Sequence, residues 1–201
     1  MRHGQTDANL YRRIQGQSDG PLNATGREQV AILGRQLQGV HIDHIIASPL
    51  QRAYDTARAI AHYHRLDVVC STAIVEWNCG MLDGLPADEF KEQVRGSGLP
   101  LSQFRPLGGE TLTEVRQRAH SFMTDVLTRY DQQTVLICSH GDFLRTCVSL
   151  MRGITIEEAS SIHLDNASCS VADHANGQWE ITALNQPATT QALDGLSPHV
   201  S

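Results

Sequence analysis

Apolar residues recur every three or four positions in two long stretches of this chain. The first stretch covers residues 30–37 and follows T-G-R-E at residues 25–28, a spacing that fits a helix-capping box. The second covers residues 112–126 and follows T-L-T-E at residues 111–114, which has the same spacing. Each pattern predicts an amphipathic helix that buries one face.

Short runs of consecutive apolar residues separate these helical patterns and predict buried strands. H-I-I-A-S at residues 44–48 and T-V-L-I-C-S at residues 134–139 are of this kind. The stretch 67–76 predicts a third extended segment. Serine and proline at 48–49 fit the N-cap and the first position of a helix that directly follows the first strand.

Shorter helical patterns cover residues 87–94 and 142–151. Near the C-terminal end of the chain, two extended stretches flank Asn176-Gly177, a dipeptide that strongly favours a hairpin turn. Strands that alternate with helices before a terminal hairpin predict an α/β sandwich with a mainly parallel central sheet. We therefore expect one domain over residues 1–184, and a loose polar tail over residues 185–201.

The composition narrows the class of protein. With 40% apolar and 19% charged residues in a chain of 201, we expect a globular domain with a substantial core. A formal net charge of −6 argues against broad electrostatic binding of nucleic acid. Five scattered cysteines and the lack of a long apolar run predict reduced thiols, a cytoplasmic location and no membrane span.

Residues capable of chemistry stand at the ends of the predicted strands. His140 follows one strand and precedes a helix, Arg52 lies in the first turn of another helix, and Glu76 follows an extended segment. Ligands of open α/β sheets bind outside the carboxyl ends of the strands, where helix N-termini favour anions. We expect this edge of the sheet to gather these three residues with Arg2 and His3.

This set of residues suits phosphoryl transfer. A neutral imidazole can attack phosphorus and carry the phosphoryl group covalently. Arg2 and Arg52 would stabilise charge on the phosphoryl oxygens, and their positive field would keep His3 neutral. Glu76 would protonate the departing alkoxide if its surroundings raise its pKa. This chemistry needs neither a metal nor a cofactor.

The motifs that carry these residues resemble those of the histidine phosphatase superfamily, in its phosphoglycerate-mutase-like branch. They occur in family order between Arg2 and Leu184. The matching positions are Arg2-His3-Gly4 with Thr6 and Asn9; Gln15-Gly16 with Pro21, Leu22 and Gly26; Ser48 with Arg52-Ala53 and Thr56-Ala57; Glu76 with Gly80 and Gly84; Gly108-Gly109-Glu110-Thr111; Ser139-His140-Gly141; and Asn166-Ala167-Ser168.

The resemblance implies a three-layer α/β/α fold and a phosphohistidine intermediate. It assigns His3 as the nucleophile, Glu76 as the general acid and then the base, and His140 as a further catalytic residue. The positions it implies for binding the phosphoryl group are Arg2, Asn9, Gln15, Arg52 and His140, with Thr6 and the backbone N–H of Gly141 as weaker candidates.

One departure from the family pattern concerns the start of the sequence. Members of the family have an apolar strand that leads into the arginine-histidine-glycine motif and lies inside the sheet, whereas only Met1 precedes Arg2 here. Loss of an interior strand would leave backbone groups unpaired. We therefore expect the natural chain to carry about five to eight apolar or β-branched residues upstream, a common strand length.

Three functions remain open. The segment 77–107 is short, lacks tyrosine and holds only three basic residues (Lys91, Arg95 and Arg105), which favours a phosphatase acting on a small phosphomonoester. The alternatives are a cofactor-dependent phosphoglycerate mutase and a phospho-ligand-binding protein with little turnover. Family mutases carry a longer, more basic insertion in this segment, and a protein without turnover would be free to lose Glu76.

No metal site is expected, because the histidine pairs at 41/44 and 62/64 lack a carboxylate set with ligand spacing. The expected partner is a small phosphorylated metabolite rather than nucleic acid or a membrane. The sequence leaves the oligomeric state open, with a homodimer among the options.

Overall fold

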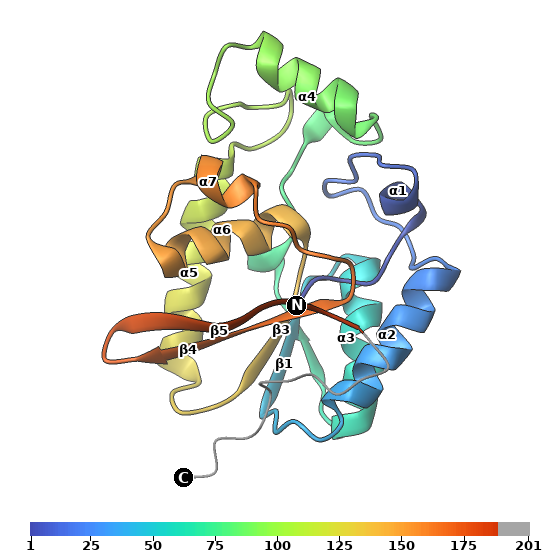
Figure 1. Cartoon of the computed structure of the whole chain (residues 1–201), viewed down its shortest axis with the longest axis vertical. Helices are drawn as coiled ribbons and strands as arrows, with labels where there is room; N and C mark the ends of the chain where they lie inside the picture. The colour runs from blue at the N-terminus through green and yellow to red at the C-terminus, as the bar shows by residue number, and fades with distance from the viewer. Residues whose placement is uncertain (189–201) are drawn as a thin grey trace.

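Helices and strands alternate along the computed structural model, which describes residues 1–188 (Figure 1). In chain order the elements are α1 (Asp7–Leu10), α2 (Ala24–Leu37), β1 (His44–Ala47), α3 (Gln51–His64), β2 (Val68–Cys70), the 3₁₀ turns η1 (Thr72–Ile74) and η2 (Gly80–Leu82), α4 (Ala87–Gly96), α5 (Leu112–Arg129), β3 (Val135–Cys138), α6 (Gly141–Arg152), α7 (Ile156–Ser160), β4 (Ser168–Ala175) and β5 (Gln178–Pro187).

The central sheet is parallel, with strand order β2-β1-β3. Ala47 at the end of β1 pairs with Cys70 on one side and with Cys138 on the other, so the three strands end at the same edge. β4 and β5 pair antiparallel as a separate hairpin. The predicted parallel α/β architecture with a C-terminal hairpin is confirmed.

Residues 1–3 lie between the two sheets. The N–H of Ser139 donates to the carbonyl of Met1 (3.0 Å), and the N–H of His3 donates back to Ser139 (3.1 Å). On the opposite side, the N–H of Arg2 donates to the carbonyl of Ser168 (3.0 Å). This short segment therefore occupies the interior-strand position that the sequence indicated, while residues upstream of Met1 stay a prediction.

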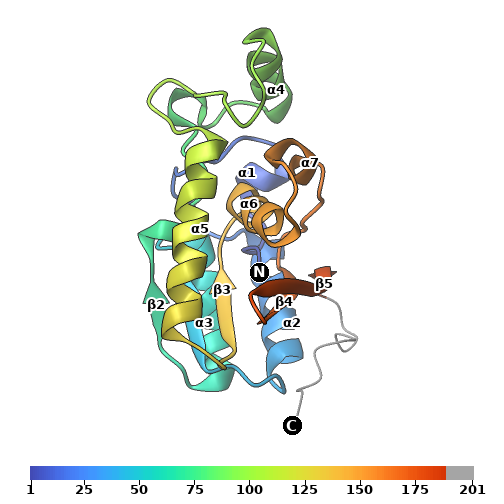
Figure 2. The same cartoon turned by 90° about the vertical axis from the view of Figure 1, so that its left-hand side faces the viewer.

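Two layers of helices cover the two faces of the sheet. Successive side chains of β1 point to opposite faces of the sheet. Ile45 and Ala47 pack into an apolar cluster with α2 and α3, whereas Ile46 packs into a second cluster with α5 and α6. Figure 2 shows α5 and α2 on opposite sides of the strands. The fold is thus the three-layer α/β/α sandwich implied by the resemblance.

The predicted hairpin turn is present, and both of its central residues have the positive φ of a type I′ turn (Asn176 at 53°, Gly177 at 76°).

β5 continues past Leu184, the predicted domain boundary, to Pro187. The predicted tail begins within that strand, and its residues 189–201 lie outside the described part of the chain. In the described part, no helix has the length and apolar character needed to cross a lipid bilayer.

Local chemistry corrects two predicted helix starts. α2 is capped by Asn23, whose side chain accepts from the N–H of Gly26 (2.8 Å), so the capping box assigned to residues 25–28 is wrong. Ser48 is also not an N-cap: α3 begins later, after Leu50, and the Ser48 hydroxyl bonds to His140 and accepts from the N–H of Leu50 (3.3 Å). The capping box at residues 111–114 is confirmed.

The third predicted strand is shorter than expected. β2 ends at Cys70, and η1 follows before Glu76 is reached. Cys70 is exposed at the edge of the sheet, whereas Ile74 is fully buried in η1. Ile74 is therefore buried by a 3₁₀ turn rather than by a longer strand.

The N-cap of α2 gives a stability test. We expect Asn23→Ala to lower the free energy of unfolding by about 1 kcal/mol, because it removes the acceptor for a helix N–H. Thr25→Ala, at an exposed position within the helix, should change it by less than about 0.5 kcal/mol. Urea unfolding of both variants measures the difference, and a larger loss for Thr25→Ala would contradict the cap assignment.

Candidate active site

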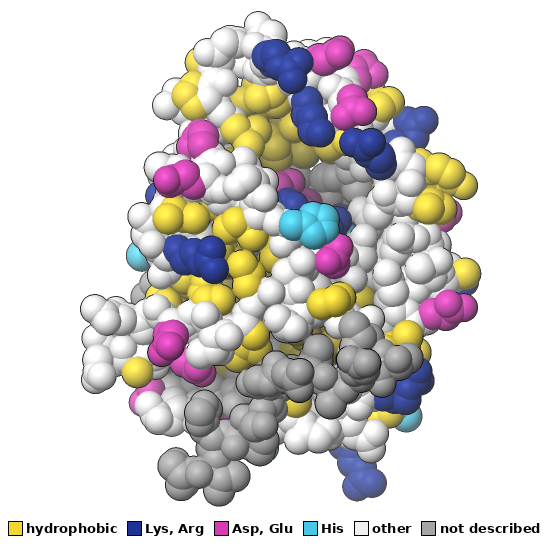
Figure 3. Space-filling model, viewed as in Figure 1, with side chains coloured by type: hydrophobic (Ala, Val, Ile, Leu, Met, Phe, Trp, Pro, Cys, Tyr) yellow, Lys and Arg dark blue, Asp and Glu magenta, His cyan; other side chains and the backbone are white. Residues whose placement is uncertain are grey.

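A polar cavity of about 150 Å³ opens at the carboxyl edge of the sheet. Arg2, His3, Arg52 and Glu76, which come from three separate parts of the chain, all line it. Figure 3 shows a hollow below the α4 segment, with hydrophobic side chains on its upper wall and Lys or Arg side chains along its rim. The predicted gathering of strand-end residues at one site is therefore observed.

His3 is buried at the base of the cavity and is held in one orientation. Its Nδ1 lies 2.7 Å from the carbonyl oxygen of Gly4, so Nδ1 carries the proton and Nε2 keeps its lone pair. Burial, followed by the positive charges of Arg52 and Arg2, holds the pKa of His3 well below its usual value. The imidazole is therefore neutral near pH 7, as a nucleophile requires.

His140 lies beside His3, with the ring centroids 5.2 Å apart. Its Nε2 is 2.8 Å from the Ser48 hydroxyl, while its buried Nδ1 has no hydrogen-bond partner. Burial and then the charge of Arg52 lower the pKa of His140 well below the usual value. His140 is not among the cavity-lining residues, although its ring is next to that of His3, which lines the cavity.

Arg2 and Arg52 each use the ends of their guanidinium groups to bind backbone carbonyls. Arg2 donates to Leu164 (2.6 Å), and Arg52 donates to Ser18 (2.8 Å) and Gly16 (2.7 Å). The Nε atom of each arginine is buried and has no protein partner. Two fixed cationic donors therefore stand at the cavity wall.

Glu76 is anchored to the N-terminus of α6. Its carboxylate accepts from the N–H groups of Trp77 (3.0 Å), Asp142 (3.2 Å) and Phe143 (3.1 Å). These bonds favour the charged form, but burial, followed by the negative charge of Asp142, outweighs them and raises the pKa of Glu76. A raised pKa suits a group that donates a proton and later accepts one.

Asn9 and Gln15 line the cavity as the sequence predicted, and Thr6 orients both of them. The Thr6 hydroxyl lies 3.1 Å from Asn9 Oδ1 and 2.9 Å from Gln15 Oε1, and it caps α1. Asn166 also donates to Asn9 Oδ1 (2.9 Å). With their oxygens engaged, the amide NH₂ groups of Asn9 and Gln15 are left for the cavity, while Thr6 is not among the residues that line it.

Gly141 lines the cavity at the start of α6. A Cβ atom added there would lie 3.7 Å from Nε of Arg2, an ordinary van der Waals contact, but only 3.1 Å from Nη1 of Arg145, so the Arg145 guanidinium would have to shift. The absence of a side chain lets the helix N-terminus approach the two arginines closely.

Arg145, which the sequence analysis missed, adds positive charge to the cavity together with Arg13. Arg145 is held by Asp142 (2.9 Å) and by the carbonyl of Ile162 (2.8 Å). Its position four residues after Gly141 places both on one face of α6, a helical spacing that would have identified it. Gly16 and Asp142 also line the cavity, and its apolar part comes from Ile14, Trp77, Cys79 and Phe90.

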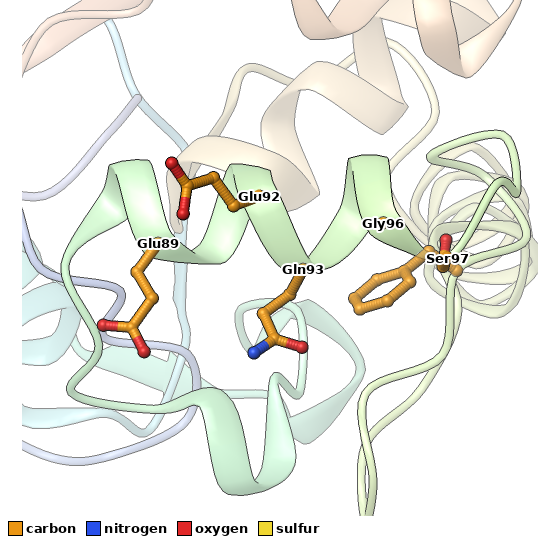
Figure 4. Close-up of a pocket in the computed structure, with 6 residues that line it drawn as sticks. Glu89, Glu92, Gln93, Gly96 and Ser97 are labelled. Atoms are coloured by element: carbon orange, nitrogen blue, oxygen red, sulfur yellow. The ribbon is translucent and has the colours of Figure 1, made fainter.

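A second, more open pocket of about 870 Å³ lies along α4, outside the site (Figure 4). Glu89 and Gln93 point to the same side of the helix, and Glu92 and Phe104 also line the pocket. Its charged lining is acidic, which would repel a phosphate. The smaller arginine-lined cavity is therefore the candidate active site.

Comparisons with known proteins agree with this geometry. Residues 1–187 match the model of the histidine phosphatase superfamily, branch 1. A relative from Salmonella paratyphi A, named probable phosphoglycerate mutase GpmB, is 34% identical over 183 residues, which are 89% of this chain and 85% of the relative.

Solved structures of phosphatases are also similar. A mycobacterial glucosyl-3-phosphoglycerate phosphatase, in complex with VO₃, superposes with a TM-score of 0.83 and 25% identity, covering 92% of this chain and 96% of that one. A candidate α-ribazole-5′-phosphate phosphatase from Escherichia coli gives a TM-score of 0.84 and 26% identity, covering 94% and 95%.

Proposed function

The chain belongs to branch 1 of the histidine phosphatase superfamily, and on that premise we propose that it hydrolyses a small phosphomonoester through a phosphohistidine on His3, without a metal or cofactor. The observation that carries this proposal is a set of three buried nitrogens without protein partners, Arg2 Nε, Arg52 Nε and His140 Nδ1, beside a neutral His3. Buried donors without partners call for an acceptor, and a phosphoryl group supplies several oxygens.

In the first step, the lone pair of His3 Nε2 attacks phosphorus and the bond to the leaving oxygen breaks. Glu76 gives its proton to that oxygen, so the alcohol leaves neutral. Arg2 and Arg52 hold the phosphoryl oxygens, and their charge is matched to the charge that develops there.

In the second step, a water molecule attacks the phosphorus of the phosphohistidine. The carboxylate of Glu76 takes a proton from that water, the N–P bond breaks, and its electron pair returns to Nε2. Inorganic phosphate leaves, and both His3 and Glu76 regain their starting states.

The size of the cavity supports a small leaving group. At about 150 Å³ it lies below the range of about 300–1,000 Å³ that is usual for drug-sized ligands. The apolar side chains of Trp77 and Phe90 close one side of it, in place of the tyrosines and basic groups expected of a mutase insertion.

A phosphoglycerate mutase is the second candidate, because the 34% identical relative carries that name. The two activities differ in the acceptor of the phosphoryl group, which is water for the phosphatase and a second phosphorylated acid for the mutase. A protein that only binds phosphorylated ligands is less well supported. Its site would need neither a neutral His3 nor a Glu76 with a raised pKa, and both are present.

The test is hydrolysis of p-nitrophenyl phosphate in EDTA, followed by a panel of phosphorylated metabolites that includes phosphoglycerates. We expect phosphate release that EDTA does not affect and that exceeds any isomerisation of phosphoglycerate. Isomerisation faster than hydrolysis would favour the mutase, and loss of activity with the chelator would contradict the mechanism.

A further inference from the structure

Arg118 connects helix α5 to the segment that carries the proposed proton donor. Its Nη2 donates to the backbone carbonyl of Glu76 (3.0 Å), and its Nη1 donates to the carbonyl of Ala73 (2.9 Å). One guanidinium therefore binds a carbonyl within η1 and the carbonyl of Glu76, which follows that turn. The proposed reaction makes no other use of this arginine.

Glu110, from the Gly108–Thr111 motif, holds Arg118 in place with a two-point contact. The Oε1 atom lies 2.9 Å from Nη2 of Arg118, and Oε2 lies 3.3 Å from Nε. Both side chains are 20% exposed, so solvent screens this pair less than a surface ion pair. Glu110 also accepts from the N–H of Asn78 (3.0 Å), and its carbonyl accepts from the indole of Trp77 (2.6 Å).

The segment around Glu76 is thus held from several directions. Gln17 donates to the same backbone carbonyl as Arg118 (2.9 Å), while the Glu76 carboxylate is bound at the start of α6 by Phe143. The guanidinium of Arg118 lies 5.2 Å from the centre of the Phe143 ring, which connects the two anchors. A shift of Arg118 would therefore move the Glu76 backbone relative to the helix that holds its carboxylate.

We propose that Arg118 and Glu110 form a positioning pair that sets the direction in which Glu76 delivers its proton to the leaving group. This inference rests on the proposed phosphatase function. Arginine is required because its planar fork serves the carbonyls of Ala73 and Glu76 and the Glu110 carboxylate together, whereas a lysine ammonium has no comparable fork.

The leaving group provides a readout that separates positioning from general structural damage. p-Nitrophenol departs readily as an anion and needs little help from an acid, whereas an alkyl alcohol departs only when it is protonated. The ratio kcat/KM reports the steps up to departure of the leaving group. A misdirected Glu76 should therefore affect alkyl phosphates much more than p-nitrophenyl phosphate.

The experiment measures kcat/KM of Arg118→Gln, Arg118→Lys and Glu110→Gln on p-nitrophenyl phosphate and on glycerol phosphate. We expect Arg118→Gln to lose about 100-fold on the alkyl substrate, the size of effect that a 1 Å misplacement causes, with little change on the aryl one. Arg118→Lys should restore only part of the loss. Arg116→Gln is the matched control, since Arg116 lies on the same helix but contacts Ile154 (3.4 Å).

Equal losses on both substrates, or no loss on either, would overturn the positioning role. If Arg118→Gln does not fold, the milder Arg118→Lys and Glu110→Gln must still show the selective loss on the alkyl substrate. Failure of the proposed function would look different, because the unaltered protein would then show no hydrolysis of p-nitrophenyl phosphate and no phosphohistidine.

Discussion

His3→Ala should reduce hydrolysis of p-nitrophenyl phosphate by about 10⁴-fold or more, because it removes the atom that receives the phosphoryl group. The hydrogen bonding of the His3 ring leaves one nitrogen for this role. Its Nδ1 is committed to the Gly4 carbonyl, so Nε2 alone remains for the attack. His140 is not among the cavity-lining residues, so it is not placed to substitute for His3.

The same variant tests the intermediate. Rapid quenching of the unaltered protein with ³²P-labelled substrate should place the label on the peptide that contains His3, and His3→Ala should take up none. His120→Ala, which changes an exposed histidine on α5, is the control and should behave like the unaltered protein. A label on any other peptide, or hydrolysis retained by His3→Ala, would rule out the proposed nucleophile.

Glu76→Gln should slow hydrolysis of an alkyl phosphate by about 10²- to 10⁴-fold, the usual contribution of a general acid. Burial and the charge of Asp142 raise the pKa of Glu76, so its protonated form persists to higher pH than that of an ordinary carboxyl group. Activity should therefore fall as the pH rises through this raised pKa, because the proton donor is then lost.

In Glu76→Gln this fall should disappear, leaving only the pH dependence that comes from the substrate. The measurement is kcat/KM between pH 4 and 9 for both proteins on the same alkyl phosphate. Glu89→Gln, a change in the open pocket along α4, is the control for loss of a carboxylate. An unchanged profile in Glu76→Gln would mean that another group protonates the leaving oxygen.

Most of the fold was accessible from local patterns. The capping box at residues 111–114, the Asn176-Gly177 turn and the apolar run of β3 each involve residues close in sequence, and each was confirmed. The errors arose where a contact distant in sequence changed the local outcome. Ser48 has the right neighbours for an N-cap, but its hydroxyl bonds to His140, 92 residues away.

Some residues of the candidate site could likewise be predicted from the sequence, and others could not. His3, Arg52 and Glu76 could be found because strand ends of a parallel sheet share one edge, and all three line the cavity. Arg118 lies within a helix, where the sequence pattern does not say which arginine turns inward, whereas Arg145 could have been found from its spacing of four residues after Gly141. Thr6 matched a family motif, yet the structure uses it to orient Asn9 and Gln15.

The sequence by itself determined the order of strands and helices, and with it the sheet edge at which the reactive residues meet, because periodicity and turn chemistry act over a few residues. The tertiary structure decided that burial raises the pKa of Glu76, that burial and the charge of Arg52 lower the pKa of His3, and that Arg118 reaches the Glu76 carbonyl across 42 positions of the chain. These properties depend on burial and on partners distant in sequence, which exist only once the chain has folded.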